Sequence, residues 1–156
     1  MRRCTETAEI LYPELCGQNL GLIEDFREYC FGNYEGKSHE ELLELPGYQE
    51  WLDSGGELTF PGGEDPAAFQ ARNVAAFGAL VRELFEEDLP AGAKEMSAAV
   101  IVHGGTIQSI LSDLTGKGFY ECGVKNGGGF ALSLSRDETQ KSGFSILRME
   151  ELAVSL

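Results

Sequence analysis

The sequence contains few of the side chains that usually bind metals. Only two of its 156 residues are histidines, and its four cysteines are widely scattered. They form no Cys-x-x-Cys pair and no Cys/His spacing of the kind that holds zinc. We therefore expect free thiols and no metal site, and nothing in the sequence predicts a cofactor. The cysteines are Cys4, Cys16, Cys30 and Cys122.

Long apolar runs are also missing. No stretch approaches about 18 consecutive apolar residues, and the N-terminal residues lack the charged-then-apolar pattern of a secretion signal. The sequence thus predicts a cytoplasmic protein that neither crosses nor enters a membrane.

Basic residues are scarce relative to acidic ones. Lys and Arg total 12 against 26 Asp and Glu, which gives a formal net charge of -14. The resulting negative field repels polyanions at long range, so nucleic acid is not expected as a partner. A few arginines gathered in one cleft can still bind a small phosphorylated substrate on an acidic protein.

What remains is ordinary globular composition, with 42% hydrophobic and 24% charged residues. At this length the chain can bury one substantial core, and we expect a single domain over residues 1–156.

Helix signals are clearest in the first two thirds of the chain. Good helix formers fill residues 3–11 and stop before Pro13. Ser38 and Glu41 have the spacing of a capping box, which predicts a short helix through residue 45. A long helix is expected over residues 66–85, because Pro66 suits a first turn and an apolar stripe follows.

Strand signals predominate in the last third. The apolar, β-branched run 98–102 is typical of a buried strand in a parallel sheet, and His103-Gly104-Gly105 leads from it into a helix that ends near residue 115. Residues 119–120, 130–134 and 144–149 also have strand patterns, and Leu20, Leu22 and Ile23 have the pattern of a short strand or an extended segment. The glycines at 127–129 predict a turn.

His103 stands where a strand gives way to a helix, the place where open α/β sheets usually bind ligands. The backbone N–H groups of Gly104, Gly105 and Thr106 would point from the helix start toward an anion. A core histidine satisfied by hydrogen bonds fits the same local pattern equally well.

Two further residues could take part in phosphate chemistry. Arg3 on the first helix has a planar guanidinium that suits phosphate. Glu28 lies between Phe26 and Phe31, where a carboxyl shielded from water is more easily protonated and could act as an acid. Judged alone, each is more typical of a solvated surface residue.

Four segments, in order along the chain, resemble the histidine phosphatase superfamily, whose fold is phosphoglycerate-mutase-like. Residues 3–11 resemble its Arg-Ala-x-Gln-Thr-Ala-x-Ile segment, and residues 28–36 its Glu-x-x-Phe-Gly-x-Trp-Glu-Gly segment. Residues 61–64 followed by Arg72 are similar to Gly-Gly-Glu-Ser…Arg, with Asp65 in the serine position. Residues 100–107, Val-Ile-Val-His-Gly-Gly-Thr-Ile, match the segment of the second histidine.

The chain departs from the family at one decisive place. The family's Arg-His-Gly motif, whose histidine becomes phosphorylated, is absent, and neither His39 nor His103 follows an arginine. In the family this motif ends the first strand, upstream of the segment at which this chain starts. We therefore expect a domain that is incomplete at its N-terminus, through a start codon assigned too far downstream or a truncation.

The resemblance implies an α/β fold of three layers, with a mostly parallel sheet and helices on both faces. It implies a phosphomonoester phosphatase, closest to the α-ribazole phosphatase type, that works through a phosphohistidine. Glu28 and His103 would be catalytic, Glu28 as proton donor, and Arg3, His103 and Gly104 would bind the phosphoryl group. The chain alone, without the nucleophile, is expected to be inactive.

Two other functions stay open at this stage. The parent could be a phosphoglycerate mutase, or a pseudoenzyme that binds phosphorylated ligands or a protein partner. In either case the missing first strand should leave a gap in the sheet, through which the isolated chain could associate with itself.

Overall fold

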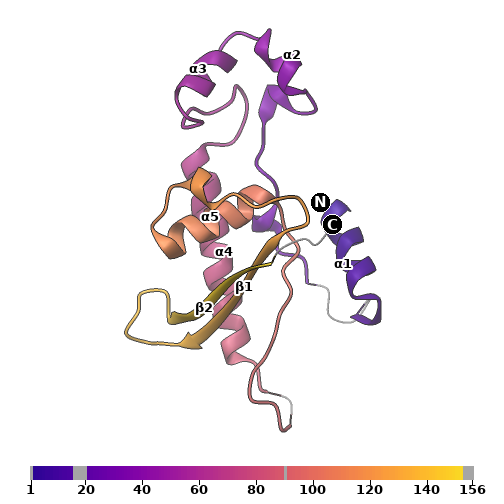
Figure 1. Ribbon diagram of the computed structural model, residues 1–156, viewed down its shortest axis with the longest axis vertical. Coiled ribbons are helices and arrows are strands. Elements are labelled where there is room, and N and C mark those ends of the chain that lie inside the picture. Colours follow the sequence, from indigo (N-terminus) through magenta and orange to yellow (C-terminus); the bar gives the residue numbers. More distant parts are fainter. Residues whose placement is uncertain (1, 16–20, 90, 153–156) are drawn as a thin grey trace.

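Helices form most of the regular structure in the computed structural model, which describes residues 2–15, 21–89 and 91–152 (Figure 1). Within these ranges no helix is long and apolar enough to cross a membrane. The α-helices are α1 (Arg2–Leu11), α2 (His39–Leu43), α3 (Tyr48–Asp53), α4 (Pro66–Glu86) and α5 (Gly104–Thr115). Short 3-10 helices cover Pro13–Leu15, Glu24–Phe26, Gly32–Tyr34 and Phe119–Cys122, and the strands are β1 (Gly129–Arg136) and β2 (Phe144–Leu152).

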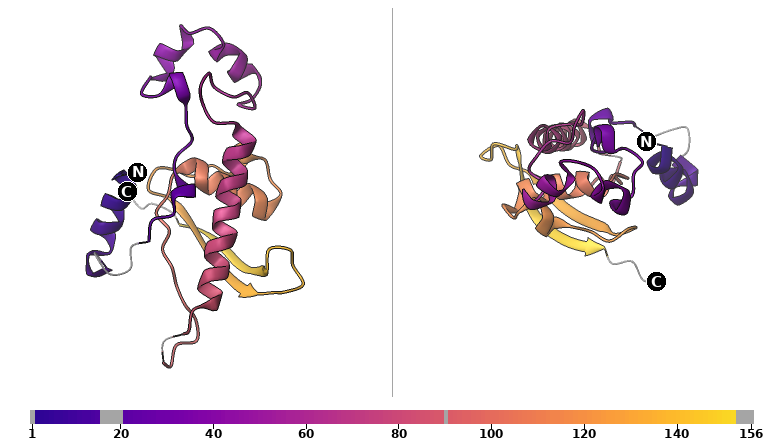
Figure 2. Two further views of the ribbon diagram at one scale, coloured as in Figure 1. Left: turned by 180° about the vertical axis from the view of Figure 1, so that it is seen from behind. Right: turned by 90° about the horizontal axis from the view of Figure 1, so that it is seen from above.

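The long helix α4 is the axis of the molecule, with α5 crossing it (Figures 1 and 2). It begins as the sequence predicts, because the Asp65 carboxylate accepts a hydrogen bond from the Ala68 N–H and Pro66 occupies the first turn. Where α4 and α5 meet, Phe26, Ala76 and Ile110 form a buried apolar cluster. This packing fixes the start of α5, where His103 lies.

A smaller lobe holds α2 and α3, at the top of Figure 1. The capping box of α2 is present: the Glu41 N–H donates to the Ser38 hydroxyl, and the Ser38 N–H donates to the Glu41 carboxylate. Aromatic side chains hold the lobe together around a second buried cluster, made by Tyr34, Leu42, Tyr48 and Phe60. The helix α3 in this lobe was not predicted from the sequence.

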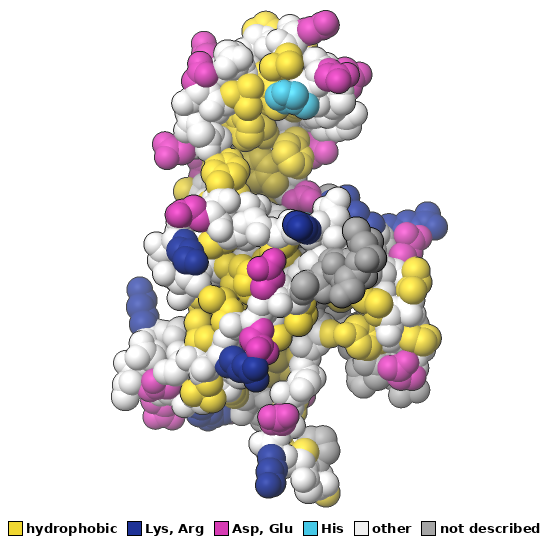
Figure 3. Space-filling model, viewed as in Figure 1, with side chains coloured by type: hydrophobic (Ala, Val, Ile, Leu, Met, Phe, Trp, Pro, Cys, Tyr) yellow, Lys and Arg dark blue, Asp and Glu magenta, His cyan; other side chains and the backbone are white. Residues whose placement is uncertain are grey.

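The sheet consists of β1 and β2, paired antiparallel, with a register irregularity between Ser133 and Leu134. Both strands lie where the strand patterns of the last third predict them. Much of β2 is exposed, including Leu147 and Met149. In Figure 3, hydrophobic side chains reach the surface on the body of the molecule and on the smaller lobe.

Two strand predictions are wrong, because residues 119–120 belong to a 3-10 helix and residues 98–102 form no strand. Of the predicted strand or extended segment at Leu20, Leu22 and Ile23, Leu20 lies outside the described residues and Ile23 has an extended backbone. A strand is stabilised by hydrogen bonds to a neighbour, and the described part of the chain pairs none with residues 98–102. A strand-like composition therefore forms no strand here, because no neighbouring strand is present among the described residues to share its backbone hydrogen bonds.

Helices together with a small antiparallel sheet are consistent with an α/β fold. The three-layer arrangement with a mostly parallel sheet is not seen in the described residues, where β1 pairs only with β2. That arrangement therefore stays a prediction.

Candidate functional site

The structure brings together Arg3, Glu28 and His103, which lie far apart in the sequence. Arg3 belongs to the first turn of α1, Glu28 follows the 3-10 helix Glu24–Phe26, and His103 immediately precedes α5. The Arg3 Nη2 lies 2.8 Å from the Glu28 Oε2 and 2.9 Å from the His103 Nδ1. One guanidinium group therefore bridges the carboxylate and the imidazole, and we call these side chains the three-residue cluster.

The protonation of His103 follows from its partner. A guanidinium nitrogen only donates hydrogen bonds, so the His103 Nδ1 must accept, and a neutral ring then has its proton on Nε2. Burial lowers the pKa of His103, the Arg3 charge lowers it further, and the Glu28 charge opposes the shift. With its side chain only 4% exposed, His103 is a neutral hydrogen-bond donor through Nε2 rather than a cation.

The Glu28 carboxylate has a partner at each oxygen. Its Oε2 accepts from Arg3, and its Oε1 accepts from the Tyr29 backbone N–H at 3.2 Å. Glu28 also lies close to the start of α5, because a Cβ added to Gly105 would be 3.6 Å from the Glu28 Oε1. Its position beside both Arg3 and α5 is suitable for a proton donor to a group held there.

Arg72 on α4 holds the loop that positions Glu28. Its guanidinium donates to both oxygens of Glu64, at 2.6 and 2.8 Å. It also donates to the backbone carbonyls of Asp25, Arg27 and Glu28, the last at 3.2 Å. The hydrogen bonds from Arg72 lower the pKa of the Glu64 carboxyl. We call Arg72 and Glu64, with the three carbonyls to which Arg72 donates, the Arg72 clamp.

Glycines allow the backbones of residues 28–36 and 61–64, two of the segments that resemble the superfamily, to pack in direct contact. The Asn33 N–H donates to the Pro61 carbonyl at 2.9 Å, and the Glu64 N–H donates to the Cys30 carbonyl at 3.0 Å. Gly32 has a φ of 56°, and a Cβ on it would lie 2.3 Å from the Gly63 nitrogen. Only glycine fits there, so residues 28–36 and 61–64 fold as one unit beside Glu28.

Tyr29 strengthens the same unit from inside. Its hydroxyl donates to the Glu64 carbonyl at 2.5 Å, and its ring packs edge-on against Phe69 of α4. Burial, aided by the Glu64 charge, raises the pKa of Tyr29 to about 12. The phenol therefore stays protonated and keeps donating over the whole neutral range.

The start of α5 provides space for an anion near His103. Gly104 is its first residue, and a Cβ there would meet nothing within 4 Å. The Thr106 side chain is fully buried, and its hydroxyl donates to the Phe26 carbonyl at 3.4 Å. Backbone N–H groups at such a helix start, next to Arg3 and the His103 Nε2, are suitable for a phosphoryl group.

Sequence reasoning missed two features of this site. It gave Arg72 no role, because only the fold shows which carbonyls that side chain reaches. It also gave none to Cys4, whose Sγ lies 3.5 Å from the His103 Nε2. The position of Cys4 next to Arg3, in the first turn of the same helix, was the available signal.

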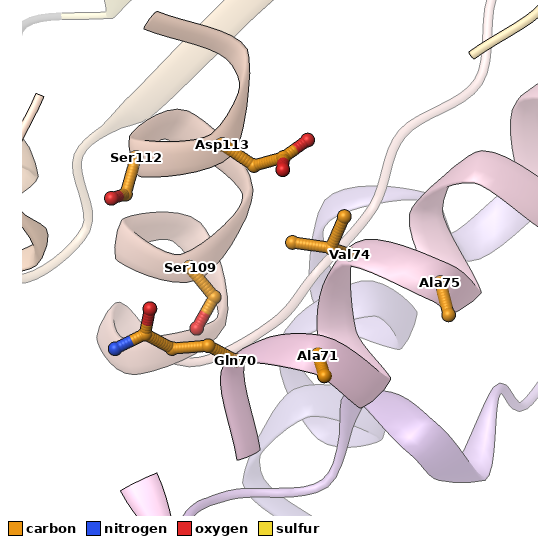
Figure 4. A pocket seen from close by; sticks show the side chains of 7 residues that line it. All are labelled: Gln70, Ala71, Val74, Ala75, Ser109, Ser112 and Asp113. Atoms are coloured by element: carbon orange, nitrogen blue, oxygen red, sulfur yellow. The ribbon is translucent and has the colours of Figure 1, made fainter. Parts of the chain in front are cut away.

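A hollow of about 470 Å³ lies elsewhere, between α4 and α5 (Figure 4). Its lining offers hydroxyl, amide and carboxylate groups, and among the described residues that form it there is no Lys, Arg or His. A phosphate dianion would meet the Asp113 carboxylate there without a compensating cation. The lining residues are Gln70, Ala71, Val74, Ala75, Ser109, Ser112 and Asp113.

Comparison with known proteins decides the family. The family model of the histidine phosphatase superfamily (branch 1) matches residues 1–151. The chain belongs to this superfamily. It is also 30% identical over 119 residues to a protein of Hydrogenobacter thermophilus named "Putative phosphoserine phosphatase 2". That match covers 75% of this chain and 53% of the relative, so the chain spans about half the length of the curated relative it matches.

Membership of the histidine phosphatase superfamily agrees with the resemblance of the four sequence segments. Within the described residues, no group of three or more His, Cys, Asp and Glu side chains could hold a metal ion.

Proposed function

We propose that the protein to which this chain contributes hydrolyses phosphate monoesters, with the three-residue cluster as part of its active site. The observation that carries the proposal is the Arg3 guanidinium held between Glu28 and His103 beside the start of α5. The name of the Hydrogenobacter thermophilus relative supports the same reaction class.

Each member of the cluster has a role in this proposal. Arg3 has five N–H donors, and its Nη2 alone contacts Glu28 and His103, so other donors can bind phosphoryl oxygens. The His103 Nε2–H and the Gly104 N–H add neutral donors for the charge that develops in the transition state. Glu28 gives a proton to the leaving oxygen as the ester P–O bond breaks.

The nucleophile is proposed to be a histidine of an Arg-His-Gly motif in a longer gene product. Its ring nitrogen attacks phosphorus and forms a phosphohistidine, which water then cleaves to inorganic phosphate. Neither histidine of this chain follows an arginine, and we therefore expect the chain alone to show no turnover. The same longer product would supply the strand beside residues 98–102 that a three-layer α/β fold requires.

Within this class we favour a small phosphatase of the α-ribazole phosphatase type over a phosphoglycerate mutase. The region between Glu28 and Trp51 is short, and its helices, which are Gly32–Tyr34, α2 and the start of α3, can form only a small cap. A mutase must retain the phosphorylated intermediate away from water, which a short cap supports poorly.

A pseudoenzyme is the second candidate, and the missing Arg-His-Gly motif is what favours it. Against it, the proposed proton donor Glu28 is present, and the Arg72 clamp holds its backbone carbonyl. The DNA upstream of Met1 separates the two: an in-frame Arg-His-Gly codon run supports the enzyme.

The direct test is an assay of the longer gene product on a panel of phosphomonoesters. We expect release of inorganic phosphate without added metal, and loss of at least ~100-fold in kcat for Glu28→Gln. The chain described here, assayed in parallel, should release none. Phosphoryl transfer between substrates without phosphate release would refute the phosphatase, and binding without any transfer would support the pseudoenzyme.

A further inference from the structure

Phe69 lies in the first turn of α4, and none of the roles proposed above uses it. The residue is only 2% exposed, so neighbouring groups enclose its ring. Its backbone is fixed as well, because its N–H donates to the Asp65 carbonyl at 2.9 Å and its carbonyl accepts from the Asn73 side-chain amide at 2.8 Å. A side chain packed in this way cannot move without moving the groups around it.

Two neighbours connect Phe69 to Glu28. The Tyr29 ring meets the Phe69 ring edge-on, with the centroids 5.2 Å apart and the planes at 90°. The Arg72 guanidinium lies over the Phe69 ring, with its Cζ 4.8 Å from the centroid, and it also donates to the Glu28 carbonyl. Phe69 therefore supports Glu28 through the residue that follows it and through the Arg72 clamp.

The third neighbour of Phe69 is the start of α5. A Cβ added to Gly105 would lie 3.1 Å from the Phe69 Cζ and 3.3 Å from its Cε1. The same Cβ would lie 3.6 Å from the Glu28 Oε1, so the end of the ring and the carboxylate meet α5 at one point. Because Gly105 has no side chain, the Phe69 ring limits how closely α5 approaches Glu28.

We propose that Phe69 is a positioning residue, whose ring holds the Glu28 carboxyl at a fixed distance from the start of α5. This role rests on the proposed function, in which Glu28 protonates the leaving oxygen of a phosphoryl group bound at that helix start. A proton donor must lie within hydrogen-bond reach of the oxygen that it protonates, and a displacement of about 1 Å can cost ~100-fold in rate. Phe69 is buried and acts through Glu28.

The contact between Phe69 and α5 can be tested in this chain by urea unfolding. Gly105→Ala should lower the urea midpoint because its methyl group presses on the ring, whereas Gly104→Ala, whose methyl group meets nothing within 4 Å, should not. When Gly105→Ala is added to Phe69→Leu, it should no longer lower the midpoint, because the smaller side chain leaves room and alanine favours the helix. Equal shifts with and without the ring would refute the contact.

The effect on catalysis is tested in the longer gene product with two esters that differ in their leaving groups. The alkyl ester glycerol 2-phosphate needs a proton on its leaving oxygen, whereas p-nitrophenyl phosphate releases a stable phenolate that needs none. For Phe69→Leu we expect kcat to fall at least ~10-fold on the first ester and less than about threefold on the second, with KM within about twofold of the wild type. An equal reduction on both esters, or none, overturns the positioning role.

Phe85→Leu is the matched control for this experiment. Phe85 lies near the other end of α4 and also has an arginine, Arg136, over its ring. This change should leave the ratio of the two rates as in the wild type. If Phe69→Leu does not fold, Gly105→Ala takes its place and should change the ratio in the same direction, because its methyl group displaces the ring.

The two experiments separate the positioning role from the proposed function. If the wild-type longer product releases no phosphate from either ester, the proposed function fails, while the urea midpoints still decide whether the ring sets the distance between Glu28 and α5. If the wild type hydrolyses both esters and Phe69→Leu keeps the wild-type ratio of rates, the positioning role fails and the proposed function stands.

Discussion

At the scale of single residues, the arrangement of Arg3 decides what the site can do. Its side chain is 61% exposed, yet its Nη2 contacts two groups that are largely covered. An arginine that reaches inward from a mostly exposed position can exchange one of these partners for an incoming anion at small cost. Glu28 is the partner with which a phosphate dianion would compete.

Replacing Glu28 should therefore make anion binding stronger in this chain while removing the proton donor. For Glu28→Gln we expect inorganic phosphate to bind roughly fivefold more tightly, or about 1 kcal/mol, because a repelling charge is gone and Arg3 is released. Titration calorimetry measures the change. Glu83→Gln on the exposed part of α4 is the matched control and should bind phosphate as the wild type does. Weaker binding in Glu28→Gln would contradict the competition.

His103 should make the folded chain sensitive to acid. Burial lowers its pKa below the ordinary 6.5, so at low pH the unfolded chain takes up a proton that the folded chain resists. The free energy of unfolding should thus fall as the pH drops below 6.5 and level off below the lowered pKa. Urea unfolding between pH 7.5 and pH 5 checks this, at roughly half-unit steps. In His103→Gln this contribution should vanish, and an unchanged slope would contradict the assignment.

At the scale of elements, the Arg72 clamp connects α4 to the loop before the smaller lobe. The Arg72 side chain donates hydrogen bonds to three loop carbonyls and to the Glu64 carboxylate, and it is only 11% exposed. Removing such a fork leaves several partly buried acceptors unsatisfied at once. The position of Glu28 therefore depends on α4.

Arg72→Lys retains the positive charge, but an ammonium group cannot make the set of hydrogen bonds that the planar guanidinium makes. We expect a loss of about 2 kcal/mol in unfolding free energy and a displaced Glu28. Urea unfolding and the amide chemical shifts of residues 25–29 are the measurements. Arg82→Lys, the same change on an exposed turn of α4, should cost roughly nothing. If both variants have the same stability and the same shifts, the clamp does not position Glu28.

At the scale of the whole molecule, residues 98–102 are notable because they have the composition of a strand without a strand partner in the described chain. They are apolar, three of the five are β-branched, Val100 is 40% exposed, and no described strand pairs with them. Unpaired extended apolar segments tend to pair with other chains. We propose that the isolated chain associates with itself through this segment.

A charge placed on the segment should weaken that association. We expect the wild type to sediment as oligomers at micromolar concentration, and Val100→Lys to shift it toward monomer. Leu58→Lys, at a position 47% exposed on another segment, should leave the oligomers unchanged. A monomeric wild-type chain with one cooperative melting transition would contradict the proposal.

The sequence predicted the features of this fold that are set locally. The Ser38 capping box, the Pro66 start of α4 and the end of α5 at Thr115 depend on neighbouring residues, and all are present. Residues 98–102 have the composition of a strand but lack a described partner, and pairing is not a local property. The contacts of Arg72 and Cys4 join residues far apart in the chain, and spacing alone does not reveal them.

The central claim is that Arg3, Glu28 and His103 form one phosphoryl-binding site. Its most direct test is to titrate this chain with inorganic phosphate and to follow the His103 ring by NMR. A bound dianion should shift the His103 signals and raise the pKa of that ring, and Arg3→Ala should abolish both effects. His103 signals that do not respond to phosphate, or that respond equally in Arg3→Ala, would contradict a shared site.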